Sequence, residues 1–504
     1  MTLTARLIPA DFDAVPSLAP SMTAEVQVGT VLSAGLDAVG YAVDTAGEGA
    51  QSLGIDFAAL VKAGFEGKSG QTLVLPQGEG AVFIAVGAGE PGAQTASSLR
   101  DFAAAFARAA TRFARVGLVV GSSFAFDALV VGQVIVEGVV LARYRYTELQ
   151  SASPNIPLKS LDIVSTEGRV ADITAGVQLG KATARAVTVT RDLSNAPPGH
   201  LTATRMGNAA IDLGAKFGFD VEVFDKEQLI ALGCGGLLGV NAGSAEEPRM
   251  IKLTYSPANP TGHVALVGKG IMYDAGGISL KPSDSMHLLM KMDMAGAAAI
   301  LGAVTALKDL GCTATVTAFL MCTDNMPSGT AMGLGDVLTI RGGKTVEIKN
   351  TDAEGRLVMA DALVLATEEF PDAIVDIATR TGSALQALGP RVAAVFGNNQ
   401  DLVEQAVAAS DETDEPIWQL PLERRYRPQL NSAYADISNM GGPFNVAITA
   451  ALFLDEFVAG VPWAHLDIAG VMQSEQDDLW RAAGATGFGA RLLVDMLVKF
   501  RRVL

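Results

Sequence analysis

The feature that most constrains the fold is an alternation of apolar runs and helical patterns in the second part of the chain. Four apolar runs each finish in polar or glycine residues: HVALVGKG (263–270), ATVTAFLMCTDN (314–325), AIVDIATRTG (373–382) and WAHLDIAGV (463–471). Helical patterns separate them, notably AGAAAILGAVTALKDLG (295–311) and the segment after Gly355. This alternation predicts an α/β domain with a mostly parallel central sheet flanked by helices, and with ligand-binding groups at the carboxyl ends of its strands.

The first part of the chain has a different character. Up to about residue 165, short apolar runs such as QTLVLP (71–76) and AVFIAVGAG (81–89) alternate with helical patterns rich in glycine and alanine, without a tight cluster of Asp, Glu, His or Cys. This pattern predicts a smaller α/β domain that supports the second part. A long connecting helix is expected next, ending before Pro197-Pro198 because proline cannot continue a helix. The expected domains are therefore 1–165, a linker helix at 166–195, and 196–504.

Length, charge and cysteine content narrow the class of protein. A chain of 504 residues is too long for one ordinary core. The net charge of −17 disfavours nucleic acid as a partner, because phosphate binding needs a clustered basic surface. Three cysteines, an odd number, favour reduced thiols. The N-terminal residues lack an apolar core of signal-peptide length, and no apolar run of about 20 residues is free of polar breaks. We expect a cytoplasmic protein that does not enter a membrane.

The octapeptide NTDAEGRL (350–357) is the strongest chemical signal. Asp352, Glu354 and Arg356 occupy alternate positions, so in an extended segment all three side chains would point to the same side. Two carboxylates at one point repel unless a proton or a cation lies between them, and divalent metals bind such oxygen ligands. The alternative interpretation is a solvated acidic turn before a helix that starts near Gly355.

Further candidates come from other segments. Lys269 lies near the end of the first apolar run and Asp274 follows it, Lys281 comes seven residues after Asp274, and Asp293 starts the small-residue helix. The spacing around Gly268-Lys269-Gly270 does not fit a phosphate-binding loop. On spacing alone, the preferred interpretation of Asp293 is a helix N-cap, which does not exclude metal ligation.

Together, four acids are expected at the strand ends of one sheet: Asp274, Asp293, Asp352 and Glu354. Four carboxylates in one cleft are hard to hold without about two divalent cations. The four histidines occur singly and are interpreted as structural: His200, His263, His287 and His465. The cysteines lack paired metal-ligand spacing, and no G-x-S-x-G motif marks a serine nucleophile.

These residues lie in segments that resemble the leucyl (cytosol) aminopeptidase family of dinuclear metallopeptidases. The matching segments are NTDAEGRLVMADAL, VGKGIMYDAGGISLKP, MKMDMAGAAA, NMPSGTAMGLGDVL, WAHLDIAG and GATGFGARLL. The resemblance covers roughly residues 170–504. It implies that the smaller N-terminal domain is macro-like, that the enzyme removes N-terminal residues from peptides with a preference for leucine-like side chains, and that the protein forms hexamers.

The resemblance also implies roles for the metal ligands. Asp274 and Glu354 would bridge two divalent ions, Zn²⁺ or Mn²⁺, with Mg²⁺ or Co²⁺ as further candidates. Lys269 and Asp293 would complete the tighter site, and Asp352 the more exchangeable one. A neutral Lys269 needs a depressed pKa, which burial and nearby cations favour.

Catalytic and substrate-binding roles follow from the same resemblance. Lys281 would stabilise the oxyanion, and Arg356 would hold a bicarbonate-like anion that carries the proton from water to the leaving amine. The substrate would contact Met290, Thr379, Arg380 and Gly382.

The sequence departs from the family pattern in four places. The segment between Lys281 and Asp293 is one residue longer, which a loop around 285–288 would absorb, and Arg380 stands where the family usually has leucine. Two further segments also differ from the family's sequence pattern, GLGDVL (333–338) and GGPFNVAITAA (441–451). Two rival hypotheses stay open here: a dipeptidase whose restricted substrate Arg380 selects, and a structural or DNA-binding accessory protein.

Overall fold

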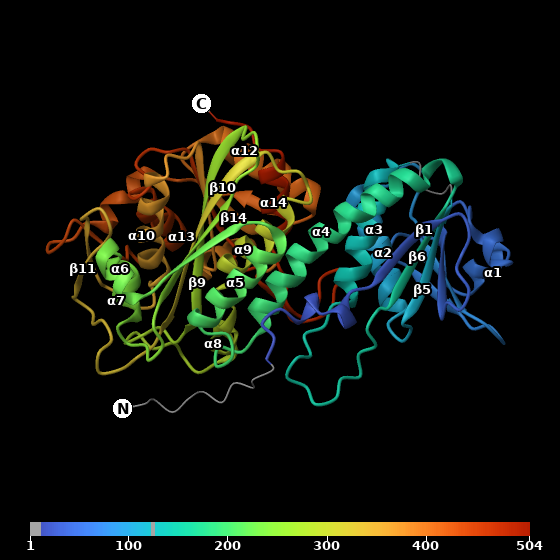
Figure 1. Cartoon of the computed structure of the whole chain (residues 1–504), viewed down its shortest axis with the longest axis horizontal. Helices are drawn as coiled ribbons and strands as arrows, with labels where there is room; N and C mark the ends of the chain where they lie inside the picture. The colour runs from blue at the N-terminus through green and yellow to red at the C-terminus, as the bar shows by residue number, and fades with distance from the viewer. Residues whose placement is uncertain (1–11, 122–125, 504) are drawn as a thin grey trace. The chain divides into compact units, whose positions relative to one another are not determined.

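The computed structural model describes residues 12–121 and 126–503, which form two compact units (Figure 1). Within the described chain, the smaller unit comprises residues 15–188 and 474–484, and the larger unit comprises 12–14, 189–473 and 485–503. Each unit has its own sheet, so the expected α/β class is confirmed for both. The boundaries expected at residues 165 and 195 stay a prediction.

The smaller unit is built on a six-stranded sheet. In spatial order its strands are β1 (Glu25–Gly29), β6 (Ser160–Ser165), β5 (Arg115–Gly121), β2 (Ala38–Val43), β4 (Val82–Gly87) and β3 (Thr72–Leu75). All neighbours pair in parallel except β3 with β4. Its helices are α1 (Phe57–Lys62), α2 (Ala96–Ala109), α3 (Ala128–Arg143) and the first part of α4 (Val170–Asn195). A buried ion pair between Arg100 and Glu137 (2.7 Å) joins α2 to α3.

The larger unit is built on an eight-stranded mixed sheet. In spatial order its strands are β15 (Ile417–Gln419), β14 (Ala393–Gly397), β17 (Trp463–Asp467), β13 (Ala373–Ala378), β9 (Gly262–Asp274), β10 (Ala314–Asn325), β8 (Arg249–Tyr255) and β7 (Asp220–Phe224). The four central strands, β17, β13, β9 and β10, run parallel. The four apolar runs of the sequence therefore form neighbouring parallel strands, and their carboxyl ends meet at one edge of the sheet.

Helices cover both faces of this sheet (Figure 1). On one face, α9 (Ala295–Leu307) packs on β9 so closely that a Cβ at Gly268 would lie 2.8 Å from the Cα of Ala297. On the other face, Ala265 and Val267 share a buried cluster with Leu357 of α10 (Gly355–Glu368). Because side chains alternate along a strand, these odd-numbered positions of β9 face α10.

The remaining elements of the larger unit surround these layers. Its other helices are α5 (Ala203–Phe217), α6 (Lys226–Leu232), α7 (Gly235–Asn241), α8 (Ser285–Leu288), α11 (Gly382–Leu388), α12 (Gln400–Thr413), α13 (Val446–Asp455) and α14 (Ala490–Val498), with short 3₁₀ turns at Leu289–Met292 and Arg424–Leu430. A small sheet contains β11 (Val337–Thr339), β12 (Thr345–Glu347) and β16 (Ile437–Ser438). The ribbon of β18 (Gln473–Ser474) and β19 (Gly484–Ala485) is separate.

The expected long helix is confirmed as α4, which ends at Asn195, two residues before the two prolines. One stretch of the described chain, Ser285–Leu307, is long and apolar enough to span a membrane by length and composition. Buried residues make up 83% of its apolar window, as in the core helix of a globular domain.

Candidate metal centre

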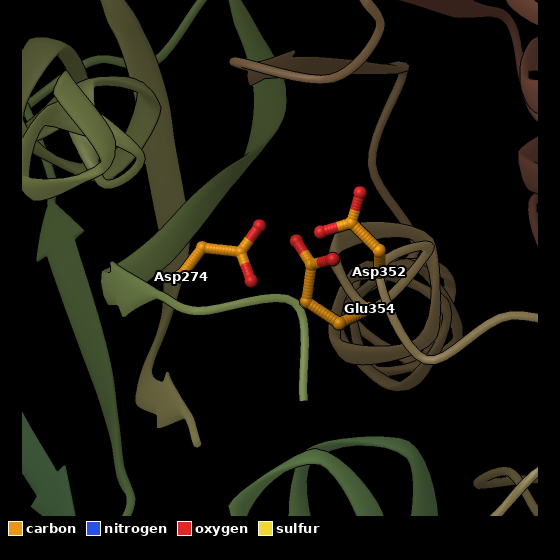
Figure 2. Close-up of side chains that lie close together, drawn as sticks. All are labelled: Asp274, Asp352 and Glu354. Atoms are coloured by element: carbon orange, nitrogen blue, oxygen red, sulfur yellow. The ribbon is translucent and has the colours of Figure 1, made fainter. Parts of the chain in front are cut away.

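Three carboxylates converge at the carboxyl end of β9. Asp274, Asp352 and Glu354 each offer an oxygen atom within 4.8 Å of the others, and Figure 2 shows the three side chains directed toward one another. Asp274 is the last residue of β9 and is buried, as is Glu354, whereas Asp352 is partly exposed. The convergence of acids that the sequence predicted is therefore present in the fold.

The local geometry of the octapeptide differs from an extended segment. Asp352 lies in a turn and Glu354 directly precedes α10, which begins at Gly355. The alternative interpretation, a turn before a helix that starts near Gly355, is correct for the backbone, but its acids are not all solvated, because Glu354 is 1% exposed whereas Asp352 is partly exposed. The expectation that all four acids occupy strand ends is also wrong, since only Asp274 does.

Lys269 lies inside β9 rather than at its end, on the same face as Ala265 and Val267. Its buried Nζ lies 2.9 Å from Glu354 Oε1 and 2.8 Å from Asp293 Oδ2, and donates to the carbonyl oxygen of Thr379. Burial alone would lower the pKa of Lys269, but Asp293, Glu354 and Asp274 raise it above its usual value. The carboxylates around Lys269 therefore favour the protonated amine.

Asp293 connects the end of the Leu289–Met292 turn to α9, but it does not cap that helix. The N-cap position is Met294, without a side-chain cap bond, so the preferred N-cap interpretation was wrong. The carboxylate accepts instead from Lys269 Nζ (2.9 Å) and from Thr379 Oγ1 (2.7 Å). Burial, partly offset by Lys269, raises the pKa of Asp293 to about 8. Because of its contacts with Lys269 and Thr379, the Asp293 side chain points toward the acidic cluster.

Lys281 lies between two of the converging carboxylates. Its Nζ is 2.9 Å from Asp274 Oδ2 and 2.6 Å from Asp352 Oδ1. Burial and the nearby charges of Asp274 and Glu354 raise the pKa of Asp352 to about 7. Burial also raises the pKa of Glu354, but Lys269 and Lys281 outweigh it and leave that pKa below its usual value. Two ammonium groups thus supply the positive charge that this group of acids requires.

Two arginines lie near the cluster. Arg356, in the first turn of α10, is buried and donates through Nη1 to the carbonyl oxygen of Asn439 (2.6 Å). Arg380 follows β13 and donates through Nη2 to the carbonyl oxygen of Ala450 (2.8 Å) in α13. Burial, and then the positive charge of Arg380, lower the pKa of Arg356 to about 9.

A cavity of about 320 Å³ opens onto the cluster. Its walls include every residue expected to bind substrate: Met290, Thr379, Arg380 and Gly382. Met290, Leu385 and Met472 give part of the wall an apolar character. This combination of apolar side chains and a few convergent polar groups is typical of a small-molecule or peptide-binding pocket.

Sequence reasoning missed two side chains that position parts of the site, one at the acidic cluster and one at the loop after β13. Asn325, the last residue of β10, donates to Asp274 Oδ1 (2.8 Å) and to the carbonyl oxygen of Thr351 (3.0 Å). Asp467, the last residue of β17, accepts from the backbone and hydroxyl of Thr381. Both are polar residues at the ends of apolar runs, and this position in the sequence could have identified them as site residues.

None of the histidines belongs to the described acidic cluster, in agreement with the sequence interpretation. His465 is buried against Asp376, and His263 contacts Thr317. His287, which hydrogen-bonds with Tyr273, does line the cavity. The three cysteines are buried and free, as expected.

The residues present fit a divalent cation. Three carboxylates within reach of one point are the oxygen donors that such ions prefer, and Lys269, 2.9 Å from Glu354, would add a nitrogen donor once deprotonated. Glu354 Oε2 is buried and has no hydrogen-bond partner among the described residues, while Oε1 of the same carboxylate lies 2.9 Å from Lys269 Nζ. A buried carboxylate oxygen without a hydrogen-bond partner is the kind of atom that a bound water or ion satisfies.

Comparison with known proteins decides the family. Residues 188–494 match the model of the cytosol aminopeptidase family catalytic domain, and residues 50–153 match the N-terminal domain of the same family. This chain belongs to the cytosol aminopeptidase family. The family resemblance seen in the sequence over roughly residues 170–504 is thereby confirmed, and the match at residues 50–153 extends it to the first part of the chain.

Relatives and solved structures agree with this family. The probable cytosol aminopeptidase of Syntrophotalea carbinolica is 39% identical over 466 residues, which cover 90% of this chain and 93% of the relative. The bottromycin maturation enzyme BotP in complex with Mn is similar, with a TM-score of 0.83 and 38% identity, over 92% of this chain and 99% of BotP. A tomato leucine aminopeptidase variant has a TM-score of 0.86 and 30% identity, over 95% and 97% of the two chains.

Family membership identifies the protein as a metal-dependent aminopeptidase that acts on peptides. The comparisons do not favour the dipeptidase or the DNA-binding accessory protein that the sequence left open.

Proposed function

We propose that the larger unit binds two divalent ions per subunit, bridged by Asp274 and Glu354. Lys269 and Asp293 complete one site, and Asp352 completes the other. The support comes from the 4.8 Å convergence of three carboxylates and from the orphaned Glu354 Oε2. Zn²⁺ or Mn²⁺ is the proposed occupant, with Mg²⁺ or Co²⁺ as further candidates, and the manganese complex of BotP supports this class of ion.

In this proposal, Lys269 must lose its proton to act as a ligand. Its pKa is raised only because the charges of Asp293, Glu354 and Asp274 outweigh burial. Divalent cations would neutralise those carboxylates, so burial and cation repulsion would then both lower the pKa of Lys269. Once cations are bound, these carboxylates therefore no longer stabilise the protonated form of Lys269.

The proposed substrates are peptides with a free N-terminus and a leucine-like first residue. Met290, Leu385 and Met472 offer an apolar wall for that side chain, beside the acidic cluster that attracts the terminal ammonium. Thr379 and Gly382 contribute to the same wall. The preference for leucine-like residues therefore follows from burial of the aliphatic side chain of the first residue. The restriction to the N-terminal peptide bond follows from the positive charge of the terminal amine.

When bound, the two ions would lower the pKa of water and polarise the peptide carbonyl group. Lys281 Nζ would donate to the oxygen atom that becomes negative during attack, where a cation stabilises the transition state more than the substrate. Arg356 would hold a bicarbonate-like anion, which accepts a proton from the water and passes it to the leaving amine. The burial of Arg356 supports a role in holding an anion away from bulk solvent.

We also propose a cytoplasmic homohexamer. The names of the relatives favour the cytosol, and exposed Phe444 and Tyr434 (each 81% exposed) are large apolar side chains of the kind found in interfaces.

The function is tested with purified protein supplied with Mn²⁺ or Zn²⁺ and leucine-p-nitroanilide. Wild-type protein should release p-nitroaniline, whereas Glu354→Ala should abolish release because the proposed bridging carboxylate is gone. Glu368→Ala is the matched control, since Glu368 lies at the opposite end of the same helix and pairs with Arg341 at the surface. Full activity of Glu354→Ala would reject the assignment.

A further inference from the structure

Four side chains at a spacing of three residues form a row along one wall of the cavity. The four residues that line the cavity in this row are Asp284, His287, Met290 and Asp293. They lie on α8 and on the Leu289–Met292 turn that follows it, with Asp284 at the N-cap of the first and Asp293 at the C-cap of the second. In such helical turns, side chains three residues apart lie on the same face. The row therefore follows one face of this segment.

Burial increases along the row and so gives its direction. Asp284 is exposed and His287 is half-buried, whereas Met290 is 9% exposed and Asp293 is 4% exposed. Asp293 pairs with Lys269 in the acidic cluster. The row thus runs from the mouth of the cavity to the proposed metal site. His287 lies one turn, about 5 Å, nearer the mouth than Met290.

The ring of His287 is held in place by Tyr273. Its Nε2 and the tyrosine hydroxyl are hydrogen-bonded at 3.1 Å, and the two rings stack with centroids 5.8 Å apart and an interplanar angle of 20°. Tyr273 lies on β9, directly before Asp274, so the central sheet anchors the imidazole. Asp284 Oδ1 also accepts from the backbone nitrogen of His287 (2.9 Å) and fixes the start of α8. A ring that is already ordered costs a ligand less entropy to bind.

One nitrogen of this ring stays available for a ligand. Within residues 12–121 and 126–503, the hydrogen bond to Tyr273 uses Nε2, and Nδ1 has no hydrogen-bond partner. An imidazole nitrogen is a donor or an acceptor, depending on the tautomer. A hydroxyl group pairs with either form, because it both donates and accepts. His287 therefore offers a hydrogen-bonding position suited to a hydroxyl at the outer part of the cavity.

The wall that lies deeper than His287 suits an aromatic ring. Met290, Leu385 and Met472 are its apolar members. Methionine side chains adapt their shape to a ligand, and their sulfur atoms make favourable contacts with aromatic rings. A leucine side chain would cover this apolar wall, whereas a longer side chain would extend toward the mouth. An aromatic ring with a hydroxyl group at its far end matches both parts of the wall.

We infer that His287 is a specificity-determining residue that hydrogen-bonds the hydroxyl group of a tyrosine at the first position of the peptide. The inference rests on the proposed function for the bond that is cleaved, and it adds tyrosine to the leucine-like first residues. Tyr273 acts as a positioning residue, because it orients the imidazole without touching the substrate. Phenylalanine fills the same apolar wall but leaves His287 without its partner.

Binding to the full-length, metal-loaded protein is measured by calorimetry with tyrosinol and phenylalaninol, amino alcohols that have no peptide bond and differ only in the ring hydroxyl. The variants are His287→Phe, which keeps a ring without nitrogens, and Tyr273→Phe. Tyr255→Phe is the matched control: its hydroxyl donates to the carbonyl oxygen of Cys312 (3.0 Å), and it pairs with Val316 near the start of β10, at the opposite end from the acidic cluster. Because both ligands are compared in the same protein, a change in the fraction of folded protein cancels.

Wild type and Tyr255→Phe should bind tyrosinol about fivefold more tightly than phenylalaninol, as one neutral hydrogen bond provides. The ratio of the two affinities should fall to about one in His287→Phe and take an intermediate value in Tyr273→Phe. A ratio of one in wild type would overturn the inference, as would an unchanged ratio in His287→Phe.

Hydrolysis of dipeptides tests which substrate residue His287 contacts. His287→Phe should lower the kcat/KM of tyrosyl-leucine relative to phenylalanyl-leucine, and leave leucyl-tyrosine and leucyl-phenylalanine in their wild-type ratio. A change confined to the second pair would place His287 beside the second residue and overturn the inference. If wild type hydrolyses no dipeptide but prefers tyrosinol through His287, the proposed function alone is rejected. If it hydrolyses all four without a preference for tyrosine, the inference alone is rejected.

Discussion

Lys269 Nζ lies 2.9 Å from Glu354 Oε1, although Lys269 comes from the interior of β9 and Glu354 from the residue before α10. The contact forms because odd-numbered positions of β9 face α10. It couples the interior of a central strand to the start of a helix, and both partners are almost fully buried. The position of α10 relative to β9 therefore sets the geometry of the acidic cluster.

Asn325 is expected to act as a positioning residue. Its amide nitrogen holds both Asp274 Oδ1 and the carbonyl oxygen of Thr351, so it fixes β9 relative to the turn that carries Asp352. Asn325→Ala should weaken metal affinity by about 10–100-fold, as loss of an outer hydrogen bond to a ligand usually does. Competition with a chromogenic chelator measures this affinity. Unchanged affinity, with normal folding by circular dichroism, would contradict the role.

Gly355 leaves room for the side chain of Lys269. A Cβ at Gly355 would lie 2.7 Å from Lys269 Cε and 2.9 Å from Nζ, so Gly355→Ala must displace the amine. We expect at least about a tenfold loss of kcat/KM, because small displacements in a catalytic site are costly. The unfolding midpoint should stay near that of wild type, since alanine favours a helix. The matched control is Gly329→Ala, where a Cβ meets no atom within 4 Å. If both variants keep wild-type kcat/KM, the contact does not matter for catalysis.

Asp376 is expected to contribute to stability. Its carboxylate accepts from Trp463 Nε1 (2.6 Å) and from His465 Nδ1, and all three side chains are buried. Asp376→Ala leaves two buried donors unpaired and should lower the free energy of unfolding by about 2–5 kcal/mol. Asp376→Asn keeps an acceptor and should cost less. Urea denaturation measures both, and a loss below about 1 kcal/mol for the alanine variant would be inconsistent with this account.

Much of the fold could be predicted because secondary structure depends largely on local sequence patterns. The apolar runs and the small-residue helix have periodicities that set their secondary structure, and Pro197 follows closely on the end of α4. Strand–helix alternation predicted the position of Asp274 at a strand end, whereas Asp352 and Glu354 reach the same point from a turn and from the residue before α10. The contacts of individual side chains could not be predicted from the sequence, because they depend on packing between distant segments.

Two residues illustrate that limit. The spacing of Asp293 suits an N-cap, yet Lys269 and Thr379 bind its carboxylate and Met294 takes the cap position. The pairing of Asn325 with Asp274 depends on the register of β9 and β10, which the sequence does not state. Alternation of acids in the octapeptide likewise suggested an extended segment, but the chain turns at Asp352 so that α10 can start at Gly355.

The most direct test of the two-ion site is the metal content of the protein. Protein treated with a chelator, reloaded with Mn²⁺ or Zn²⁺ and dialysed should contain two ions per subunit, lose leucine-p-nitroanilide hydrolysis on chelation and regain it on reloading. Glu354→Ala should contain at most one ion and stay inactive, because both ions share that carboxylate in the proposed arrangement. Full activity in chelated protein, or two ions in an active Glu354→Ala variant, would contradict the account.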